Sequence, residues 1–297
     1  MSGRRRIGLL GFGEVGQILA ADLRSQGGAE IVVWDPLFRS PASGPARAVA
    51  AGLASATSGL AEAVGGAELI VSAVTAAQCI AAAAAAAPSL AAGAVYLDLN
   101  SVAPVTRTVA SAAVEAVGGR YVEAAVMSPI GPKRIASPML LGGPHAEALL
   151  PMLRATGFAG ATAFSPLIGR ASAAKMCRSV MIKGMEALLG EALLAARHHG
   201  VEQEVLDSLR DLFPGLDWRT LARYMISRSL QHGRRRAEEM REVALTVDET
   251  GVGSWMSRAA VERQDWASRR SAALASQSLE PMLDAILAGP DSGDATA

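Results

Sequence analysis

Short apolar runs alternate with helical periodicity through the first half of the chain. Each run is bounded by glycine, proline or polar residues, as strands are. The expected strands are residues 6–10, 30–35, 53–56, 69–74, 95–98, 121–126, 139–141 and 161–165. Helices are expected between them, at 17–24, 44–52 and 76–87, after Pro104, and at 144–156. This alternation predicts an α/β fold with a doubly wound, mostly parallel sheet and helices on both faces.

The second half of the chain has no strand pattern. From Ile168 onward the apolar residues follow helical periodicity only, and a long first helix is expected at 171–199. The expected interruptions are Gly200, Pro214-Gly215, Gly233 and residues 251–253. The sequence therefore predicts two domains: an α/β domain at 1–166 and an all-α domain at 167–297.

A glycine-rich segment, Gly11-Phe12-Gly13-Glu14-Val15-Gly16, joins the first expected strand to the first expected helix. Gly11 permits a tight turn, Gly13 lets the backbone approach a pyrophosphate, and Gly16 lets the helix pack on the strand. The phosphates then meet the positive N-terminus of the helix. In this setting the G-x-G-x-x-G spacing predicts a Rossmann dinucleotide-binding domain with residues 11–16 at the cofactor.

The residue that ends the second expected strand indicates which dinucleotide binds. Asp35 lies 19 residues after Gly16, where an acid accepts hydrogen bonds from the adenosine ribose hydroxyls and repels a 2′-phosphate. We therefore expect NAD as the cofactor. Arg39 is close enough along the chain to leave NADP open.

Polar or turn-forming residues follow three of the later strands. They are Val74-Thr75, Asn100-Ser101 and Ser128. Ligands of such sheets bind beyond the carboxyl ends of the strands, so these residues are expected to line one crevice. The first two pairs are expected near the nicotinamide. Ser101 alternatively serves only as a cap for the helix that opens after Pro104.

Lys175 is the strongest candidate for proton transfer. The chain has 25 Arg and only three Lys, at 133, 175 and 183. Arginine has taken almost every other cationic position, so a position that remains lysine is a candidate for a role that arginine cannot perform. Arginine cannot release a proton at working pH, whereas the pKa of a partly buried lysine can be lowered until it acts as an acid or base. The alternative is an ordinary surface lysine.

Polar residues follow Lys175 on the same expected helix. On a helical wheel Ser179 lies about 40° and Arg178 about 60° from Lys175, so these three are expected to face one site. Lys183 is offset by about 80° and reaches that site only from the flank. We expect these side chains, with Ser128, to bind the substrate.

Residues 231–242 form a second polar concentration, rich in Arg and Glu. On one helix His232, Arg235, Arg236 and Glu239 share a face. This face is either solvated and held by ion pairs, or it is an anion site in which Arg236 binds a carboxylate or phosphate and His232 assists. The glutamates that follow so closely make nucleic-acid binding an unfavourable interpretation.

Composition excludes several other classes of protein. The net charge is zero and the pI is near 6.9, which gives no electrostatic case for nucleic acid or an anionic membrane. Cys79 and Cys177 have neither metal-ligand nor redox spacing, so we expect buried free thiols, a reducing cytoplasm and no metal. The N-terminal apolar stretch is too short and too rich in glycine for a signal or membrane-spanning segment.

The order of these motifs resembles that of the β-hydroxyacid dehydrogenase family, which includes 6-phosphogluconate and 3-hydroxyisobutyrate dehydrogenases. The resemblance covers nearly the whole chain. The glycine loop is intact, residues 98–101 correspond to the family's D-x-S-T segment, 123–129 to its D-A-P-V-S-G-G segment, and 169–179 to its G-x-G-x-x-x-K-x-x-N-N helix. The resemblance implies a Rossmann domain followed by an all-α domain, a catalytic role for Lys175, and a homodimer paired through the helical half.

The departures from the family pattern fall where substrate is recognised. Met127 stands in place of the family serine, with Ser128 one position later, and Arg178-Ser179 replaces the asparagine pair. Ala171 replaces the second glycine of the catalytic helix motif. Residues 232–242 look like those of a phosphogluconate-dehydrogenase-like branch whose substrate is unassigned. We therefore expect a small anionic or polyhydroxylated substrate without naming it.

The expected reaction is hydride transfer between the nicotinamide and the alcohol carbon of a hydroxyacid or related alcohol. Lys175 would accept the hydroxyl proton, or donate it to the carbonyl in the reverse direction. The pKa of Lys175 would be lowered by burial in the cleft between the domains and by Arg178 nearby. Two alternatives stay open. One is an NADPH-dependent reductase of ketones or imines on the same scaffold. The other is a dinucleotide-binding protein without catalysis, which the altered substrate segment favours and the retained Lys175 disfavours.

Overall fold

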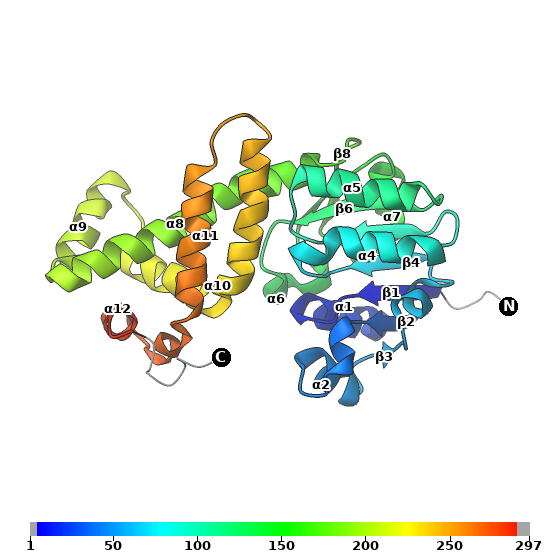
Figure 1. Ribbon diagram of the computed structural model, residues 1–297, viewed down its shortest axis with the longest axis horizontal. Coiled ribbons are helices and arrows are strands. Elements are labelled where there is room, and N and C mark those ends of the chain that lie inside the picture. The colour runs from blue at the N-terminus through cyan, green and yellow to red at the C-terminus, as the bar shows by residue number, and fades with distance from the viewer. Residues whose placement is uncertain (1–4, 290–297) are drawn as a thin grey trace. The chain divides into compact units, whose positions relative to one another are not determined.

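The computed structural model describes residues 5–289 of the 297-residue chain. The chain divides into two compact units, residues 1–176 and 177–297. Figure 1 shows that the first unit contains the sheet and the second contains helices. The domain boundary that the change of sequence pattern places near Pro166 stays a prediction.

One eight-stranded sheet organises the first unit. Its strand order is β3-β2-β1-β4-β5-β6-β7-β8, and all neighbouring strands are parallel except β6 and β7. The strands are β1 (Arg5–Leu10), β2 (Ala29–Trp34), β3 (Ser55–Ala56), β4 (Leu69–Ser72), β5 (Val95–Asp98), β6 (Arg120–Val126), β7 (Met139–Gly142) and β8 (Ala161–Ser165). The order reverses between β1 and β4, which is the switch point where sheets of this kind bind their ligands.

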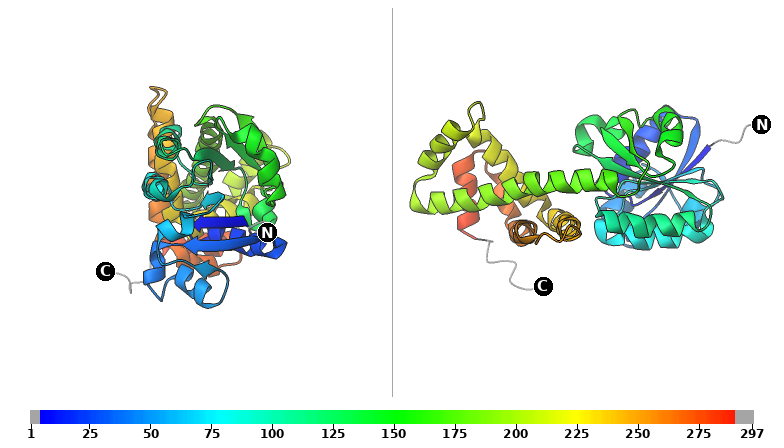
Figure 2. Two further views of the ribbon diagram at one scale, coloured as in Figure 1. Left: turned by 90° about the vertical axis from the view of Figure 1, so that its right-hand side faces the viewer. Right: turned by 90° about the horizontal axis from the view of Figure 1, so that it is seen from above.

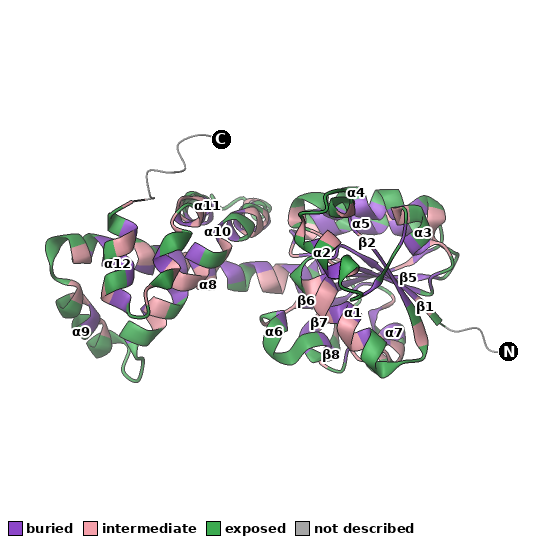
Figure 3. Cartoon of the chain, turned by 90° about the horizontal axis from the view of Figure 1, so that it is seen from below, coloured by how far each residue is buried: buried purple, intermediate pink, exposed green. Residues whose placement is uncertain are grey.

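Helices cover both faces of this sheet, as Figure 3 shows. One face is covered by α3 (Leu60–Val64), α4 (Cys79–Ala86) and α5 (Pro104–Glu115), and the other by α1 (Glu14–Gln26) and α7 (Ala146–Ala155). Adjacent residues of a strand serve opposite cores: Leu9 packs with Leu19 of α1, whereas Leu10 packs with Ala63 of α3. The parallel strands are buried on both faces, as their continuous apolar runs predict.

Shorter elements complete the first unit. They are α2 (Gly44–Ala50), α6 (Ile130–Lys133) and the 3₁₀ turns η1 (Pro36–Arg39), η2 (Ala76–Gln78), η3 (Ala87–Ser89) and η4 (Arg134–Ala136). The sequence pattern did not predict α3 or α6, because each is too short to show helical periodicity. It predicted one helix over 76–87, which the structure divides into η2, α4 and the beginning of η3.

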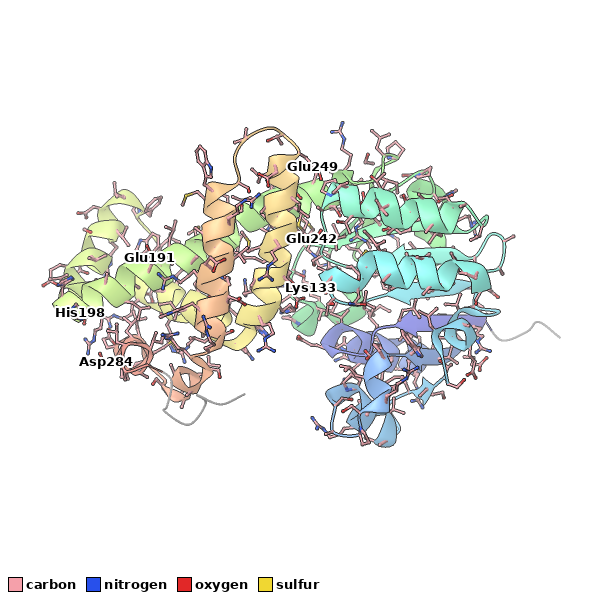
Figure 4. All side chains as sticks on the ribbon, in the orientation of Figure 1. Lys133, Glu191, His198, Glu242, Glu249 and Asp284 are labelled. Atoms are coloured by element: carbon pink, nitrogen blue, oxygen red, sulfur yellow. The ribbon has the colours of Figure 1, made fainter. Side chains whose placement is uncertain are left out.

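Five α-helices and one 3₁₀ turn carry residues 170–287. They are α8 (Arg170–His199), α9 (Glu202–Leu212), α10 (Trp218–Asp248), α11 (Trp255–Ser268), η5 (Ser271–Ala275) and α12 (Leu279–Leu287). Helices α10 and α11 form a hairpin, visible in Figures 1 and 2. The core of the helical unit joins Leu193 of α8, Leu206 of α9, Ile226 of α10 and Met282 of α12. Ion pairs such as that of Arg263 with Glu191 lie nearer the surface, and Figure 4 labels Glu191.

The interruption expected at Gly233 is confirmed as a kink in α10. The backbone angles of the adjacent His232 are not helical (φ −126°, ψ 15°), so two helical segments meet at this point. Gly233 is needed for packing: a Cβ there would overlap the backbone of Gln264 and Ser268 on α11. The glycine that interrupts the helical periodicity in sequence therefore also lies where two helices pack closely.

The predicted fold class is confirmed. An α/β unit with a doubly wound, mostly parallel sheet precedes a helical unit. Within residues 5–289, no helix combines the length and the low charge that crossing a membrane requires.

Candidate functional site

The glycine loop is closely packed between β1 and α1. Gly11 has φ +90°, which favours glycine, and its amide donates to the Trp34 carbonyl of β2 at 2.9 Å. A Cβ on Gly11 would lie 2.5 Å from the Ala73 carbonyl oxygen beyond β4, and one on Gly16 would overlap the Gly11 carbonyl. These two glycines are therefore required by the fold itself.

Gly13 is different. It is exposed, has φ −72°, and a Cβ there would meet no described atom within 4 Å. It is the N-cap of α1, and no described side chain caps that helix end. The first amides of a helix have no partner within the helix. A helix N-terminus that no described side chain caps, beside an exposed glycine, fits a dinucleotide pyrophosphate, so the residues present match the cofactor that the motif predicts.

Asp35 lies at the end of β2, buried against the glycine loop. Its Oδ2 accepts the Phe12 amide at 2.7 Å and its Oδ1 accepts the Leu37 amide at 2.8 Å. The carboxylate therefore fixes the loop and caps η1. A carboxylate has about four lone-pair sites, so two of them remain for further donors. Arg39, at the end of η1, is exposed.

The ends of β4 and β5 are joined by side chains. Asn100 Nδ2 donates to Ser72 Oγ at 3.1 Å, and the buried Asn100 Oδ1 has no hydrogen-bond partner among the described residues. Val74 is half-buried and Thr75 is exposed. Because Gly11 contacts the segment after β4, the loop, Val74 and Asn100 lie at one edge of the sheet. The structure thus brings together the ends of β4 and β5, two of the three strand ends that were expected to lie together.

Lys175 lies on the second turn of α8, beside the segment after β5. Its Nζ donates to Ser101 Oγ at 2.6 Å. Ser101 does not cap α5, because the N-cap of that helix is Ala103. The hydroxyl therefore orients the ammonium, and Lys175 and Ser101 are brought together from 74 residues apart.

Behind this contact lies a buried polar network that sequence reasoning missed. Arg107 of α5 pairs with Asp98 at the end of β5, Nη1 to Oδ1 at 2.6 Å, and neither side chain is more than 1% exposed. Tyr121 Oη and Cys79 Sγ donate to the other Asp98 oxygen, at 2.6 and 3.3 Å. Glu123 of β6 accepts the Ala171 amide of α8 at 3.1 Å.

The protonation states in this network follow from burial and from Asp98. Burial alone would lower the pKa of Arg107, but Asp98 raises it well above its usual value. Burial first, and then Asp98, raise the pKa values of Tyr121 and Cys79. Arg107 is therefore charged, while the phenol and the thiol are protonated and act as donors.

The remaining substrate candidates have different surroundings. Ser128 is half-buried after β6 and its hydroxyl donates to the adjacent Pro129 carbonyl at 3.3 Å. On α8, Arg178 is exposed and Ser179 is buried. Both follow Lys175 by one turn of the same helix, as predicted.

Lys183 and Arg236 are both buried and paired with acids of the helical unit. Lys183 Nζ lies 2.6 Å from Glu239 Oε2, and Arg236 pairs with Glu186. Burial raises the pKa of Glu186 although Arg236 opposes the shift. His232 is half-buried at the kink of α10. Arg236 and Glu239 of residues 231–242 are therefore ion-paired, but Arg236 is buried, which the interpretation as a solvated face did not predict.

Two other features lie apart from this edge. A cavity of about 420 Å³ opens under the N-terminal ends of β1, β4, β5 and β6 and is lined by Arg5, Arg6 and Arg120, at the edge of the sheet opposite the glycine loop.

Both cysteines are free, but only Cys79 is buried; the expectation of a buried Cys177 is wrong. Its position on α8 faces outward, which apolar composition alone did not reveal.

Comparison with known families agrees with this geometry. The family model described as the NAD binding domain of 6-phosphogluconate dehydrogenase matches residues 6–159. The chain belongs to the β-hydroxyacid dehydrogenase family. A second family model, described as a domain of unknown function (DUF1932), matches residues 196–267 in the helical unit. A comparison with curated protein sequences gave no significant match.

Solved structures extend the similarity over the whole chain. A conserved hypothetical protein from Sinorhizobium meliloti 1021 is 39% identical, with 95% of this chain and 96% of that chain covered and a TM-score of 0.71. The conserved protein MTH1747, described as structurally similar to 3-hydroxyacid dehydrogenases, is 34% identical, with 88% and 96% covered and a TM-score of 0.67. Mycobacterium tuberculosis 3-hydroxyisobutyrate dehydrogenase shares the fold at 16% identity, with 96% and 99% covered and a TM-score of 0.69.

The family resemblance inferred from the four motifs is therefore confirmed. As a β-hydroxyacid dehydrogenase family member the protein is an NAD(P)-dependent oxidoreductase, and its first unit is the NAD(P)-binding Rossmann domain. The predicted cofactor class is confirmed with it. Within this family, the substrate of the chain is unassigned.

The open cradle at Gly13 gives a direct test of cofactor placement. Gly13→Ala should leave the melting temperature nearly unchanged, because the new methyl group meets no described atom. It should weaken NADH binding at least tenfold, because the methyl group occupies the space that the pyrophosphate needs. Fluorescence titration with NADH measures the affinity and thermal denaturation measures the stability. Equal NADH affinity in the two proteins would place the pyrophosphate elsewhere.

Proposed function

We propose that the protein is a dehydrogenase that oxidises the alcohol carbon of a hydroxyacid or related small alcohol, with Lys175 as its general acid and base. The observation that carries the proposal is the 2.6 Å hydrogen bond from Lys175 Nζ to Ser101 Oγ. It supports a lysine held at the carboxyl edge of the sheet, where Rossmann domains bind the reactive end of their cofactor.

The chemistry divides between the cofactor and the chain. Bound NAD(P) accepts or donates the hydride at its nicotinamide. Lys175 takes the hydroxyl proton during oxidation and returns it to the carbonyl oxygen during reduction. Ser101 accepts a hydrogen bond from the lysine and so fixes the direction in which the remaining Nζ hydrogens point. Residues 11–16, Asp35, Val74, Thr75 and Asn100 would hold the cofactor.

Substrate recognition would rest mainly on Ser128, Arg178 and Ser179. Arg178 is exposed one turn after Lys175, so its guanidinium is free of the burial that holds Lys183 and Arg236. An exposed arginine fork binds a carboxylate in two parallel hydrogen bonds. We therefore assign the acidic group of the substrate to Arg178, and a supporting role to Lys183, His232 and Arg236 within the helical unit.

Loss of the lysine amine tests the catalytic role. Lys175→Ala should lower turnover by about 10²–10⁴ while leaving NADH affinity nearly intact, since a positioned acid or base contributes a factor of this size. The assay follows NADH formation with a panel of 3-hydroxyacids. Lys133→Ala is the matched control, because Lys133 is exposed at the end of α6, as labelled in Figure 4. Turnover in Lys175→Ala equal to that of the control would refute the role.

We also propose that NAD is preferred over NADP. The Asp35 carboxylate keeps acceptor sites for ribose hydroxyls, and its negative charge repels a 2′-phosphate.

Thermal-shift titration with the four dinucleotides measures this preference, because a ligand that binds only the folded state raises the melting temperature. NAD and NADH should give the larger shifts. Asp35→Asn removes the negative charge but keeps a hydrogen-bond acceptor. It should therefore reduce the difference between the thermal shifts with NAD(H) and with NADP(H). A larger shift with NADPH in the wild type would reverse the assignment and favour the reductase alternative.

A cytoplasmic homodimer completes the proposal. On α8 of the helical unit, Met181 and Leu188 are 63% and 56% exposed, two helical turns apart and therefore on one face. Apolar residues repeated on one helix face are typical of surfaces that pair. We propose that a second copy of the chain covers this face.

A charge placed on the face tests the pairing. Leu188→Glu should shift the protein from dimer to monomer in light scattering, because burying an unpaired carboxylate opposes association. Leu212→Glu is the control, since Leu212 is 73% exposed on α9. A dimer that withstands both substitutions would exclude this face, and a monomeric wild type would exclude the homodimer.

A further inference from the structure

Arg107 makes contacts on both of the segments that carry the proposed catalytic pair. Its Nη1 donates to the carbonyl of Asp98, the last residue of β5, at 3.0 Å, and its Nη2 donates to the Asn100 carbonyl on the segment that follows. On α8, its Nε donates to Ser172 Oγ at 2.9 Å. The side chain is fully buried, so each of these contacts is shielded from water.

The Arg107 contacts and the Lys175 hydrogen bond join the same two segments, α8 and the segment after β5. Asn100 immediately precedes Ser101, and Ser172 lies one helical turn before Lys175. The Lys175 to Ser101 hydrogen bond joins the same two segments that Arg107 joins from behind. A shift of α8 along the sheet would have to break the Ser172 contact as well as the lysine contact.

Glu123 fixes the start of the same helix. Its Oε1 accepts the Ala171 amide, and its Oε2 lies 3.8 Å from Arg107 Nε. A carboxylate at a helix N-terminus satisfies a free amide and interacts favourably with the helix dipole. Gly142 makes room for it, because a Cβ at that position would overlap the Glu123 carboxylate.

We propose that Arg107 is a positioning residue for Lys175 that acts through Ser172 Oγ on α8 and through the Asn100 carbonyl on the Ser101 segment. The catalytic part of this inference rests on the proposed function. The geometric part does not, because it concerns only where the ammonium lies. Arginine suits the task, since its planar fork reaches several acceptors in fixed directions, whereas a lysine offers one point charge.

The variant that isolates the link is Ser172→Ala. It removes the acceptor on α8 and leaves the Arg107, Asp98 and Tyr121 contacts in place. The matched control is Ser111→Ala: Ser111 is also a buried serine of the first unit, and its hydroxyl donates to Thr108 within α5. Both variants lose one hydroxyl, but only Ser172→Ala loosens α8.

The scarcity of lysine provides a readout that needs no substrate. The chain has three lysines, so a protein labelled with ¹⁵N at the lysine side chains gives three ammonium signals, and the one missing in Lys175→Arg identifies Lys175. Ser172→Ala should shift this signal and change its titration midpoint, because Ser101 accepts from the ammonium only while both segments are held. Ser111→Ala should leave the Lys175 signal unchanged.

Activity adds the second readout. Ser172→Ala should lower kcat about tenfold to a hundredfold with NADH affinity unchanged, since small misplacements of a reacting group have costs of this size. Arg107→Lys keeps the charge beside Asp98 but cannot span Ser172 and Asn100, so it should move the Lys175 signal in the same direction as Ser172→Ala does. This variant has four lysines, and the signal that is missing from the double variant Arg107→Lys/Lys175→Arg identifies Lys175.

The outcomes separate the inference from the proposed function. An unchanged Lys175 signal in Ser172→Ala overturns the positioning role, even where stability falls. A moved signal with unchanged kcat supports the positioning role and counts against Lys175 as the acid and base. A moved signal with lowered kcat, absent in Ser111→Ala, supports both.

Discussion

The buried ion pair between Arg107 and Asp98 is the interaction on which the first unit depends. Both groups are withdrawn from water, and removal of one partner from such a pair typically costs about 3–5 kcal/mol. Asp98 is fully satisfied, because its two oxygens accept from Arg107, the Asn100 amide, Tyr121 and Cys79. Asp98, at the end of β5, therefore joins α4, α5 and the segment that carries Ser101.

The two units use charge differently. At the carboxyl edge of the sheet, the glycine loop presents backbone groups: the uncapped amides of α1 beside Gly13. Near Lys175, by contrast, oriented side chains such as Ser101 determine the geometry. In the helical unit, buried cations such as Lys183 and Arg236 are paired with glutamates and join helices together. The exposed Arg178 is thus better suited to an incoming anion than the more conspicuous arginine run.

Much of the fold was predictable because its signals are local. Apolar runs marked the strands, and the glycine spacing marked the turn from β1 to α1, since both patterns depend on residues adjacent in sequence. Arg107 gave no such signal: it looks like an ordinary helix residue, and its partner Ser172 lies 65 positions away. Cys177 was misinterpreted, and the packing of Gly233 against α11 was missed, for the same reason: packing partners and outward faces are set by tertiary structure.

The contrast between the two thiols has a practical consequence. Cys79 is buried and its proton is kept by burial and by Asp98, whereas Cys177 is exposed. A thiol reagent attacks the thiolate, so Cys177 reacts in the native state and Cys79 only after its surroundings open. The two alkylation rates can be measured in the same molecule. The rate at Cys79, compared with the rate at Cys177, reports how often the buried network around Asp98 opens.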